Sequence, residues 1–239
     1  MTRSGFVALA GRPNVGKSTL VNMLVGHKVA IVSDKPQTTR RAIRGVATAG
    51  EHQLVLVDLP GVQRPRDALT ERMQRRVERE LADSDAALFV LNGEEGAGPG
   101  DRFIASALRR AGLLPEGPYL FPPDERSDQP EDVLIAELVR EQVLRRTFQE
   151  VPHAVEVVID DLAQPRDDLT LVRALVWVEA ESQKGILIGA GGRMIKAVGT
   201  AARKELEREL GTRVHLDLSV RVRRGWRGDE ALLDRLGID

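Results

Sequence analysis

The stretch GRPNVGKST at residues 11–19 matches the pattern G-x-x-x-x-G-K-[ST] at every fixed position. An apolar run at residues 6–10 precedes it and predicts a buried strand, and an apolar pattern at residues 20–25, closed by Gly26, predicts a helix. A strand, a glycine loop and a helix N-terminus in this order make an anion site, because loop N–H groups point inward and the helix dipole favours negative charge. The sequence therefore predicts a phosphate-binding loop.

The two residues expected to contact the phosphates and the metal ion lie at the end of this loop. Lys17 is expected to bridge the outer phosphates of a nucleotide, and Ser18 is expected to hold Mg²⁺ through its hydroxyl. We expect nucleotide contacts along the whole loop, which comprises Gly11, Arg12, Pro13, Asn14, Val15, Gly16, Lys17, Ser18 and Thr19.

Two later segments fit a nucleotide switch. Thr38 and Thr39 follow the first helix, where a threonine commonly closes over Mg²⁺ and the γ-phosphate; Thr39 is the favoured ligand, and a solvated pair is the alternative. An apolar strand at residues 54–57 ends in an aspartate that can reach Mg²⁺ and a glycine whose N–H can approach the γ-phosphate. Nucleotide contacts are therefore also expected at Asp58, Leu59, Pro60 and Gly61. The predicted catalytic residues are Lys17, Thr39 and Gly61, and the predicted metal ligands are Ser18, Thr39 and Asp58.

Composition sets broad limits on the function. The 239 residues suffice for two modest domains, and the net charge of −1 indicates no class of partner. The absence of cysteine excludes disulfides, thiolate ligands and cysteine nucleophiles. Residues 1–10 do not resemble a signal peptide, and no apolar run approaches the ~18 residues of a membrane span, so we expect a soluble intracellular protein.

The first part of the chain alternates strands and helices. Strands are predicted near residues 29–33, 42–48, 54–57 and 86–91, and helices over 66–82 and 101–110. This order predicts an α/β fold with a parallel sheet covered by helices.

The pattern then breaks off. GTPases recognise guanine through N-K-x-D, and neither N-K-x-D nor T-K-x-D occurs anywhere in this sequence. Residues 115–130 instead hold five prolines and predict an extended linker. The predicted division is a shortened P-loop domain at 1–114, the linker at 115–130 and a second domain at 131–239.

The second domain has its own signature. A helix at 131–148 and strands at 155–159 and 171–178 are followed by an apolar turn, the sequence G-x-x-G at Gly189–Gly192 and a long helix that ends at Gly211. An alternating strand at 214–222 and a short helix at 229–236 complete the chain. This order resembles an α+β type II KH domain, whose G-x-x-G loop clamps a nucleic-acid backbone.

An excess of basic residues near the G-x-x-G loop supports a nucleic-acid-binding domain. Residues 193–227 hold ten Lys or Arg against four Asp or Glu, although an ordinary solvated face is the alternative. The predicted RNA contacts are Gly189, Ala190, Gly191, Gly192, Arg193 and Lys196. Trp226 fits either a core anchor or a place on this basic surface.

A P-loop GTPase followed by a type II KH domain resembles the Era GTPases of bacterial ribosome assembly. The resemblance rests on GRPNVGKSTL, KPQTTR, DLPG, ESQKGILIGAGGRMIK and RVRRGWR. It implies a cytoplasmic, monomeric protein that hydrolyses GTP with Mg²⁺, binds 16S rRNA and assists small-subunit assembly, with peripheral membrane contact. It also implies a K⁺ ion at Asn14, and the apolar Val62 fits relatives that lack a water-positioning glutamine.

The chain departs from the family in one place. The strands that carry the guanine motifs are missing between about residues 110 and 115. Three functions therefore compete: an Era-type GTPase, an RNA-binding module with a catalytically dead P-loop, and a nucleotidase without base specificity.

Overall fold

The computed structural model describes residues 2–35, 38–61, 67–93, 98, 118–122, 124–147 and 151–238. The chain divides into two compact units, the first formed by Met1–Val32, Pro36–Gln129 and Leu233–Asp239, the second by Ser33–Lys35 and Pro130–Leu232. The sequence-based division places residues 233–239 in the second domain, whereas in the structure they belong to the first unit. Among the described helices, none has both the length and the apolar character that crossing a membrane requires.

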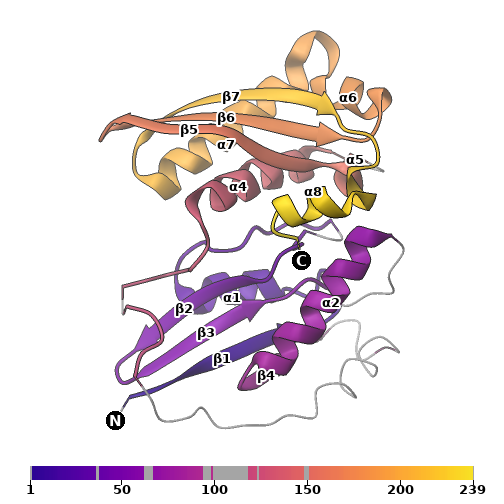
Figure 1. The fold of residues 1–239 in the computed structure, drawn as a ribbon. Helices are drawn as coiled ribbons and strands as arrows, with labels where there is room; N and C mark the ends of the chain where they lie inside the picture. Colours follow the sequence, from indigo (N-terminus) through magenta and orange to yellow (C-terminus); the bar gives the residue numbers. More distant parts are fainter. Residues whose placement is uncertain are drawn as a thin grey trace. The chain divides into compact units, whose positions relative to one another are not determined.

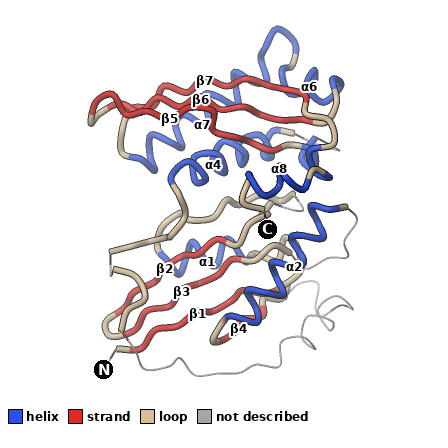
Figure 2. The backbone as a smooth tube through the Cα atoms, in the orientation of Figure 1, coloured by secondary structure: helices blue, strands red, loops and turns tan. Residues whose placement is uncertain are grey.

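The first unit is built on a four-stranded sheet (Figures 1 and 2). Its strands are β1 (Arg3–Ala10), β2 (Ile43–Ala49), β3 (His52–Asp58) and β4 (Ala86–Phe89), in the order β2-β3-β1-β4. β1 pairs in parallel with β3 and β4, as the sequence predicts, but β2 runs antiparallel to β3. A short turn joins β2 and β3, and only antiparallel neighbours can be joined so briefly.

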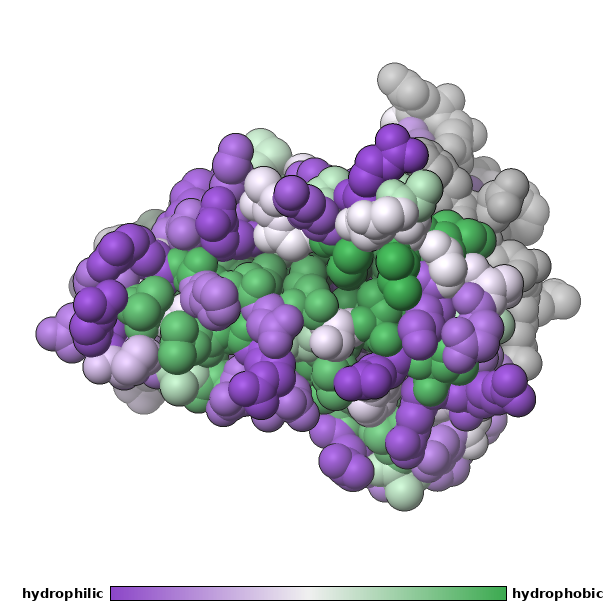
Figure 3. All heavy atoms as spheres, turned by 90° about the horizontal axis from the view of Figure 1, so that it is seen from above, coloured by the Kyte–Doolittle hydropathy of each residue, from purple (hydrophilic) through white to green (hydrophobic). Residues whose placement is uncertain are grey.

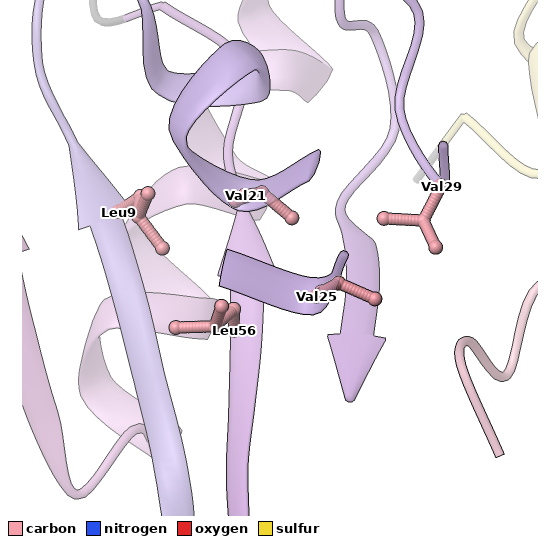
Figure 4. Packing of buried hydrophobic residues seen from close by; sticks show 5 residues of the cluster. All are labelled: Leu9, Val21, Val25, Val29 and Leu56. Carbon is pink, nitrogen blue, oxygen red and sulfur yellow. The ribbon is translucent and has the colours of Figure 1, made fainter. Parts of the chain in front are cut away.

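Helices cover both faces of this sheet. Helix α1 (Lys17–Val25) packs on one face, where Leu9, Leu56 and Val29 join its Val21 and Val25 in a buried cluster (Figure 4). On the other face, Val77 of helix α2 (Ala68–Asp83) joins a cluster with Ala8, Val57 and Leu59. The consecutive β1 residues Ala8 and Leu9 thus pack on opposite faces of the sheet, because successive side chains of a strand point to opposite sides.

Residues 29–33 do not form the predicted strand. The Asn22 side chain accepts hydrogen bonds from the Val29 and Ala30 N–H groups and donates to the Ala30 carbonyl. The Asn22 side chain therefore forms the hydrogen bonds that the backbone of Val29 and Ala30 would otherwise form with a neighbouring strand. Val29, Ala30 and Ile31 are buried although they do not join the sheet.

The proline-rich segment is packed against the sheet, and the expectation of a separate linker was wrong for its described part. Gln53 of β3 bonds the backbone of Leu120 and Phe121, and Val46 of β2 donates to the Arg126 carbonyl. These contacts place the segment in the first unit. The predicted helix at 101–110 lies outside the described residues.

The second unit is a three-stranded sheet with helices. Its strands β5 (Glu156–Arg166), β6 (Leu169–Val178) and β7 (Arg213–Val222) lie in that order, β5 antiparallel and β7 parallel to β6. The parallel strands β6 and β7 need a crossover connection. It consists of helix α6 (Glu181–Ile188), the short 3₁₀ segment Ala190–Gly192 and helix α7 (Arg193–Leu210). The other helices are α4 (Glu131–Arg146), α5 (Val151–Ala154) and α8 (Glu230–Arg235), with a second 3₁₀ turn at Trp226–Gly228.

This unit confirms most of the predicted elements. The KH-type order of a helix, two strands, two helices and a strand is present, and α4 is buried from Ile135 to Leu144 around its whole circumference. The predicted apolar turn before the G-x-x-G loop was wrong, because Glu181–Ile188 is the helix α6.

Candidate functional site

Lys17 is folded back over its own loop. Its ammonium group donates to the carbonyl oxygens of Gly11 (3.2 Å) and Arg12 (3.0 Å), and the side chain is buried. The loop turns through positive φ angles at Asn14 (62°) and Gly16 (96°). This geometry encloses a cation within a curved backbone ahead of α1, which is the arrangement that binds phosphate.

Ser18, Thr39 and Asp58 meet in one cluster. The Ser18 hydroxyl donates to Asp58 Oδ2 at 2.6 Å, and the Thr39 hydroxyl donates to the same oxygen at 3.3 Å. The two hydroxyl oxygens lie 3.1 Å apart. The structure therefore brings together all three predicted metal ligands from α1, the following loop and the end of β3.

The second carboxylate oxygen of Asp58, Oδ1, indicates which ligand the cluster of Ser18, Thr39 and Asp58 fits. Asp58 is fully buried, and its Oδ1 has no hydrogen-bond partner among the described residues. A buried carboxylate oxygen without a partner is costly unless a ligand satisfies it, and Mg²⁺ prefers carboxylate and hydroxyl oxygens. The cluster therefore fits Mg²⁺, with Ser18, Thr39 and Asp58 as the residues that would hold it.

Burial shifts both charged groups toward their neutral forms. Burial raises the pKa of Asp58, against the opposing effects of the Ser18 hydrogen bond, the Lys17 charge and the Thr39 hydrogen bond. Burial also lowers the pKa of Lys17, against the charge of Asp58. An anion beside Lys17 and a cation beside Asp58 would each restore the charged form, so the site is electrostatically complementary to a metal–phosphate pair.

Gly61 lies directly against the loop. A Cβ atom at Gly61 would come within 2.7 Å of the Cα and N atoms of Pro13, so only glycine fits at this distance. The end of the D-L-P-G segment therefore lies against the phosphate loop, whereas Leu59 is buried in the hydrophobic cluster with Ala8, Val57 and Val77. Val62 and the region expected to lack the guanine motifs lie outside the described residues.

The G-x-x-G loop is open on its outer side. Gly191 and Gly192 adopt positive φ angles of 60° and 77°, and a Cβ atom at either would meet nothing within 4 Å. A phosphate can therefore approach this backbone at the start of α7. Arg193 is exposed and donates to the Ala190 carbonyl, and Lys196 is exposed one turn further on.

A groove continues from this loop between α7 and the edge strand β7. It has a volume of about 340 Å³ and is lined by Ile195, Lys196, Gly199, Thr200, Arg203, Leu216 and Leu218. In Figure 3 an apolar band on the upper face is bordered by polar side chains. The groove thus has apolar side chains on both elements and two cations, Lys196 and Arg203, on the α7 side. A single nucleic-acid strand suits this lining, because its bases can pack on apolar surface while its phosphates lie beside the cations. Sequence reasoning missed Thr200 and Arg203, although their four-residue spacing from Lys196 and Gly199 marks the same face of α7.

Trp226 is a core anchor. It is fully buried, and its Nε1–H donates to the Ala154 carbonyl at 3.0 Å. The alternative of a place on the basic surface was therefore wrong.

Comparison with known proteins agrees with this geometry. A family profile described as a 50S ribosome-binding GTPase matches residues 6–116, and a KH-domain profile matches residues 150–227. GTPase Era of Mycobacterium avium (strain 104) is 40% identical over 294 aligned positions, which cover 98% of both chains. The chain belongs to the Era GTPases. GTPase Era of Mycobacterium tuberculosis (strain ATCC 25177 / H37Ra) matches with the same identity and coverage.

Two solved structures share both units. One is Era in complex with MgGDPNP and nucleotides 1506–1542 of 16S ribosomal RNA, with 30% identity, a TM-score of 0.95 and coverage of 100% of this chain and 99% of that chain. The other is a single-residue variant of Aquifex aeolicus Era bound to GDP·AlF4⁻, with 30% identity, a TM-score of 0.94 and coverage of 99% of both chains. The predicted fold class, a P-loop GTPase domain followed by a KH domain, is confirmed.

The alignment lengths also show how this family member differs. The 294 aligned positions exceed the 239 residues of this chain by 55, so the relatives have at least that many positions where this chain has none. The place predicted for a missing block, between residues 110 and 115, lies outside the described residues.

Proposed function

We propose that this Era GTPase binds the 3′ region of 16S rRNA through its KH unit and assists assembly of the small ribosomal subunit, with GTP hydrolysis at the P-loop. The observation that carries the proposal is the meeting of Lys17, Ser18 and Thr39 around Asp58, whose buried Oδ1 has no partner among the described residues. A metal–nucleotide complex would supply a cation for this oxygen and an anion for Lys17.

At the nucleotide site, different residues bind the phosphates and the metal. Lys17 binds the outer phosphates and neutralises charge that grows there as the terminal phosphoryl group leaves. Ser18, Thr39 and Asp58 supply oxygen ligands, and Gly61 allows a backbone N–H to face the terminal phosphate. Bound Mg²⁺ would supply further positive charge to the phosphate oxygens.

Potassium is the second ion in this proposal. Asn14 holds a left-handed backbone conformation in the loop, at the position that the family resemblance assigns to a K⁺ ligand. A cation at this place could take the part of the arginine that other GTPases insert.

At the RNA site the loop and the groove act together. The backbone from Gly189 to Gly192 accepts a phosphate, Arg193 and Lys196 add charge, and the groove beyond them takes the following nucleotides. The relative crystallised with nucleotides 1506–1542 of 16S rRNA supports the choice of RNA.

The experiment that tests the proposal is RNA and nucleotide binding by one preparation. An RNA with the sequence of nucleotides 1506–1542 should bind, and an RNA of the same length and shuffled sequence should bind more weakly. A chain that binds nucleotide but neither RNA would contradict the assembly role. The cytoplasmic location, peripheral membrane contact and monomeric state are also part of the proposal, and cell fractionation with light scattering tests them.

A further inference from the structure

The last residues of the chain are held by the first unit. Residues 233–239, here called the tail, follow the KH unit in sequence but belong to the GTPase unit. Leu233 and Ile238 are fully buried. The tail is therefore an anchored segment of the GTPase unit.

Two arginines bind the tail. Arg41 Nε donates to the Leu236 carbonyl at 2.8 Å. Arg72 Nη1 donates to the Ile238 carbonyl at 3.1 Å and forms an ion pair with Asp234. The Arg72 side chain is 12% exposed and the Asp234 side chain is 66% exposed, so water partly screens the ion pair, whereas the bond to the Ile238 carbonyl is part-buried.

Arg41 and Arg72 lie on or directly after the two segments that the sequence assigns to a nucleotide switch. Arg41 follows Thr39, whose hydroxyl bonds the metal-site carboxylate of Asp58. Arg72 lies in the first turns of α2, the helix that follows the D-L-P-G segment. In GTPases these two segments are ordered by contacts to the γ-phosphate and Mg²⁺ and released after hydrolysis.

We propose that Arg41 and Arg72 are positioning residues that clamp the tail against both switch segments, and that this clamp couples nucleotide binding to RNA binding. The coupling rests on the proposed function. Because the tail continues directly from the KH unit, a change in the order of the switch segments alters how firmly the end of that unit is held. Linkage then requires RNA to change nucleotide affinity by the same factor as nucleotide changes RNA affinity.

The test measures the dissociation constant of the 1506–1542 RNA with and without Mg²⁺ and the GTP analogue GDPNP. The parent should show a ratio of about fivefold or more between the two conditions, which is the lower end of typical coupling. Arg41→Ala and Arg72→Ala should reduce the ratio to below about twofold while GDPNP alone still binds. Thermal unfolding of each variant checks that it is folded.

Two controls keep the result specific. Arg75→Ala removes an arginine from the same helix that is 55% exposed and pairs only loosely with Glu71, at 3.9 Å, so it should keep the parental ratio. The exchange Arg72→Asp with Asp234→Arg restores an ion pair and should recover part of the coupling that Arg72→Ala loses.

The outcomes separate the two proposals. If the parent bound no nucleotide or no RNA, the proposed function would be overturned, and the coupling with it. If both ligands bound but the parental ratio were one, or Arg41→Ala and Arg72→Ala kept the parental ratio, the clamp alone would be overturned.

Discussion

The Ser18 hydroxyl donates a 2.6 Å hydrogen bond to Oδ2 of Asp58, 40 positions further along the chain. The bond joins the start of α1 to the end of β3, and Thr39 bonds the same carboxylate oxygen. Oδ1 of that carboxylate has no partner within the part of the chain that the structure describes. The three side chains predicted to hold the metal therefore lie within hydrogen-bond distance of one another.

Magnesium binding should weaken in acid at a higher pH than an ordinary aspartate would cause. Burial raises the pKa of Asp58, and Mg²⁺ binds only the ionised form, so affinity falls as the pH drops through this raised pKa. Calorimetric titration of Mg²⁺ into the GDP complex between pH 5 and 8 checks this, after subtraction of Mg²⁺ binding to free GDP. Asp58→Asn should bind weakly at every pH. A parental profile as flat as that of the variant would contradict the assignment.

Discrimination between GTP and ATP should be weak. A site that reads a base rejects the wrong one by leaving buried polar groups unpaired, at ~1–3 kcal/mol per group. This sequence has no N-K-x-D motif, and its relatives have at least 55 more positions. Competition between labelled GTP and unlabelled ATP should give affinities well within about a hundredfold of each other. A GTP preference beyond that range would show that another residue reads the base. Mycobacterium avium GTPase Era provides the control.

Hydrolysis should require potassium. Asn14 is the only described residue other than glycine with a positive φ, and the K⁺ site is proposed at its side chain. Phosphate release should be faster in KCl than in NaCl of equal ionic strength. Asn14→Gly keeps the backbone conformation available and removes the amide, so its rates in the two salts should be equal. Equal rates for the parent would remove the K⁺ site from the account.

RNA binding should depend on Gly191. The variant Gly191→Asp places a Cβ atom and a carboxylate in open space beside the loop, where a phosphate would approach, so RNA affinity should fall while the fold remains. Gly211→Asp is the matched control, because Gly211 has a similar φ of 68° in open space at the other end of α7. For the parent, log affinity against log salt should have a slope of ~−0.7 per phosphate neutralised. Parental affinity in Gly191→Asp would show that the clamp lies elsewhere.

The sequence predicted the phosphate and metal residues because their chemistry fixes both residue type and spacing. Lys17 and Ser18 are adjacent, and Asp58 ends an apolar strand, so each pattern is visible locally. The wrong predictions, a strand at residues 29–33 and a separate proline-rich linker, concern segments whose position depends on contacts between residues distant in sequence. Asn22 holds residues 29 and 30 out of the sheet, and Gln53 holds the proline-rich segment against it. The arginines around Trp226 in sequence do not indicate its burial, which depends on its hydrogen bond to the distant Ala154 carbonyl.

Helix α6 was missed for a different reason. Gly185 lies within it, and glycine lowers helix propensity by about 1 kcal/mol relative to alanine. Packing of Leu187, which is fully buried, outweighs that preference. Local propensity was overridden by tertiary contacts, which the sequence does not display.

Labelled GTP binding to Lys17→Ala, with Mg²⁺ present, tests the central claim most directly. The Lys17 ammonium lies across the loop carbonyls of Gly11 and Arg12 and is the cation assigned to the outer phosphates. We expect the parent to bind GTP and Lys17→Ala to show no measurable binding, while both proteins bind the 1506–1542 RNA equally well in the absence of nucleotide. Unchanged GTP affinity in Lys17→Ala would contradict the assignment of this loop as the nucleotide site.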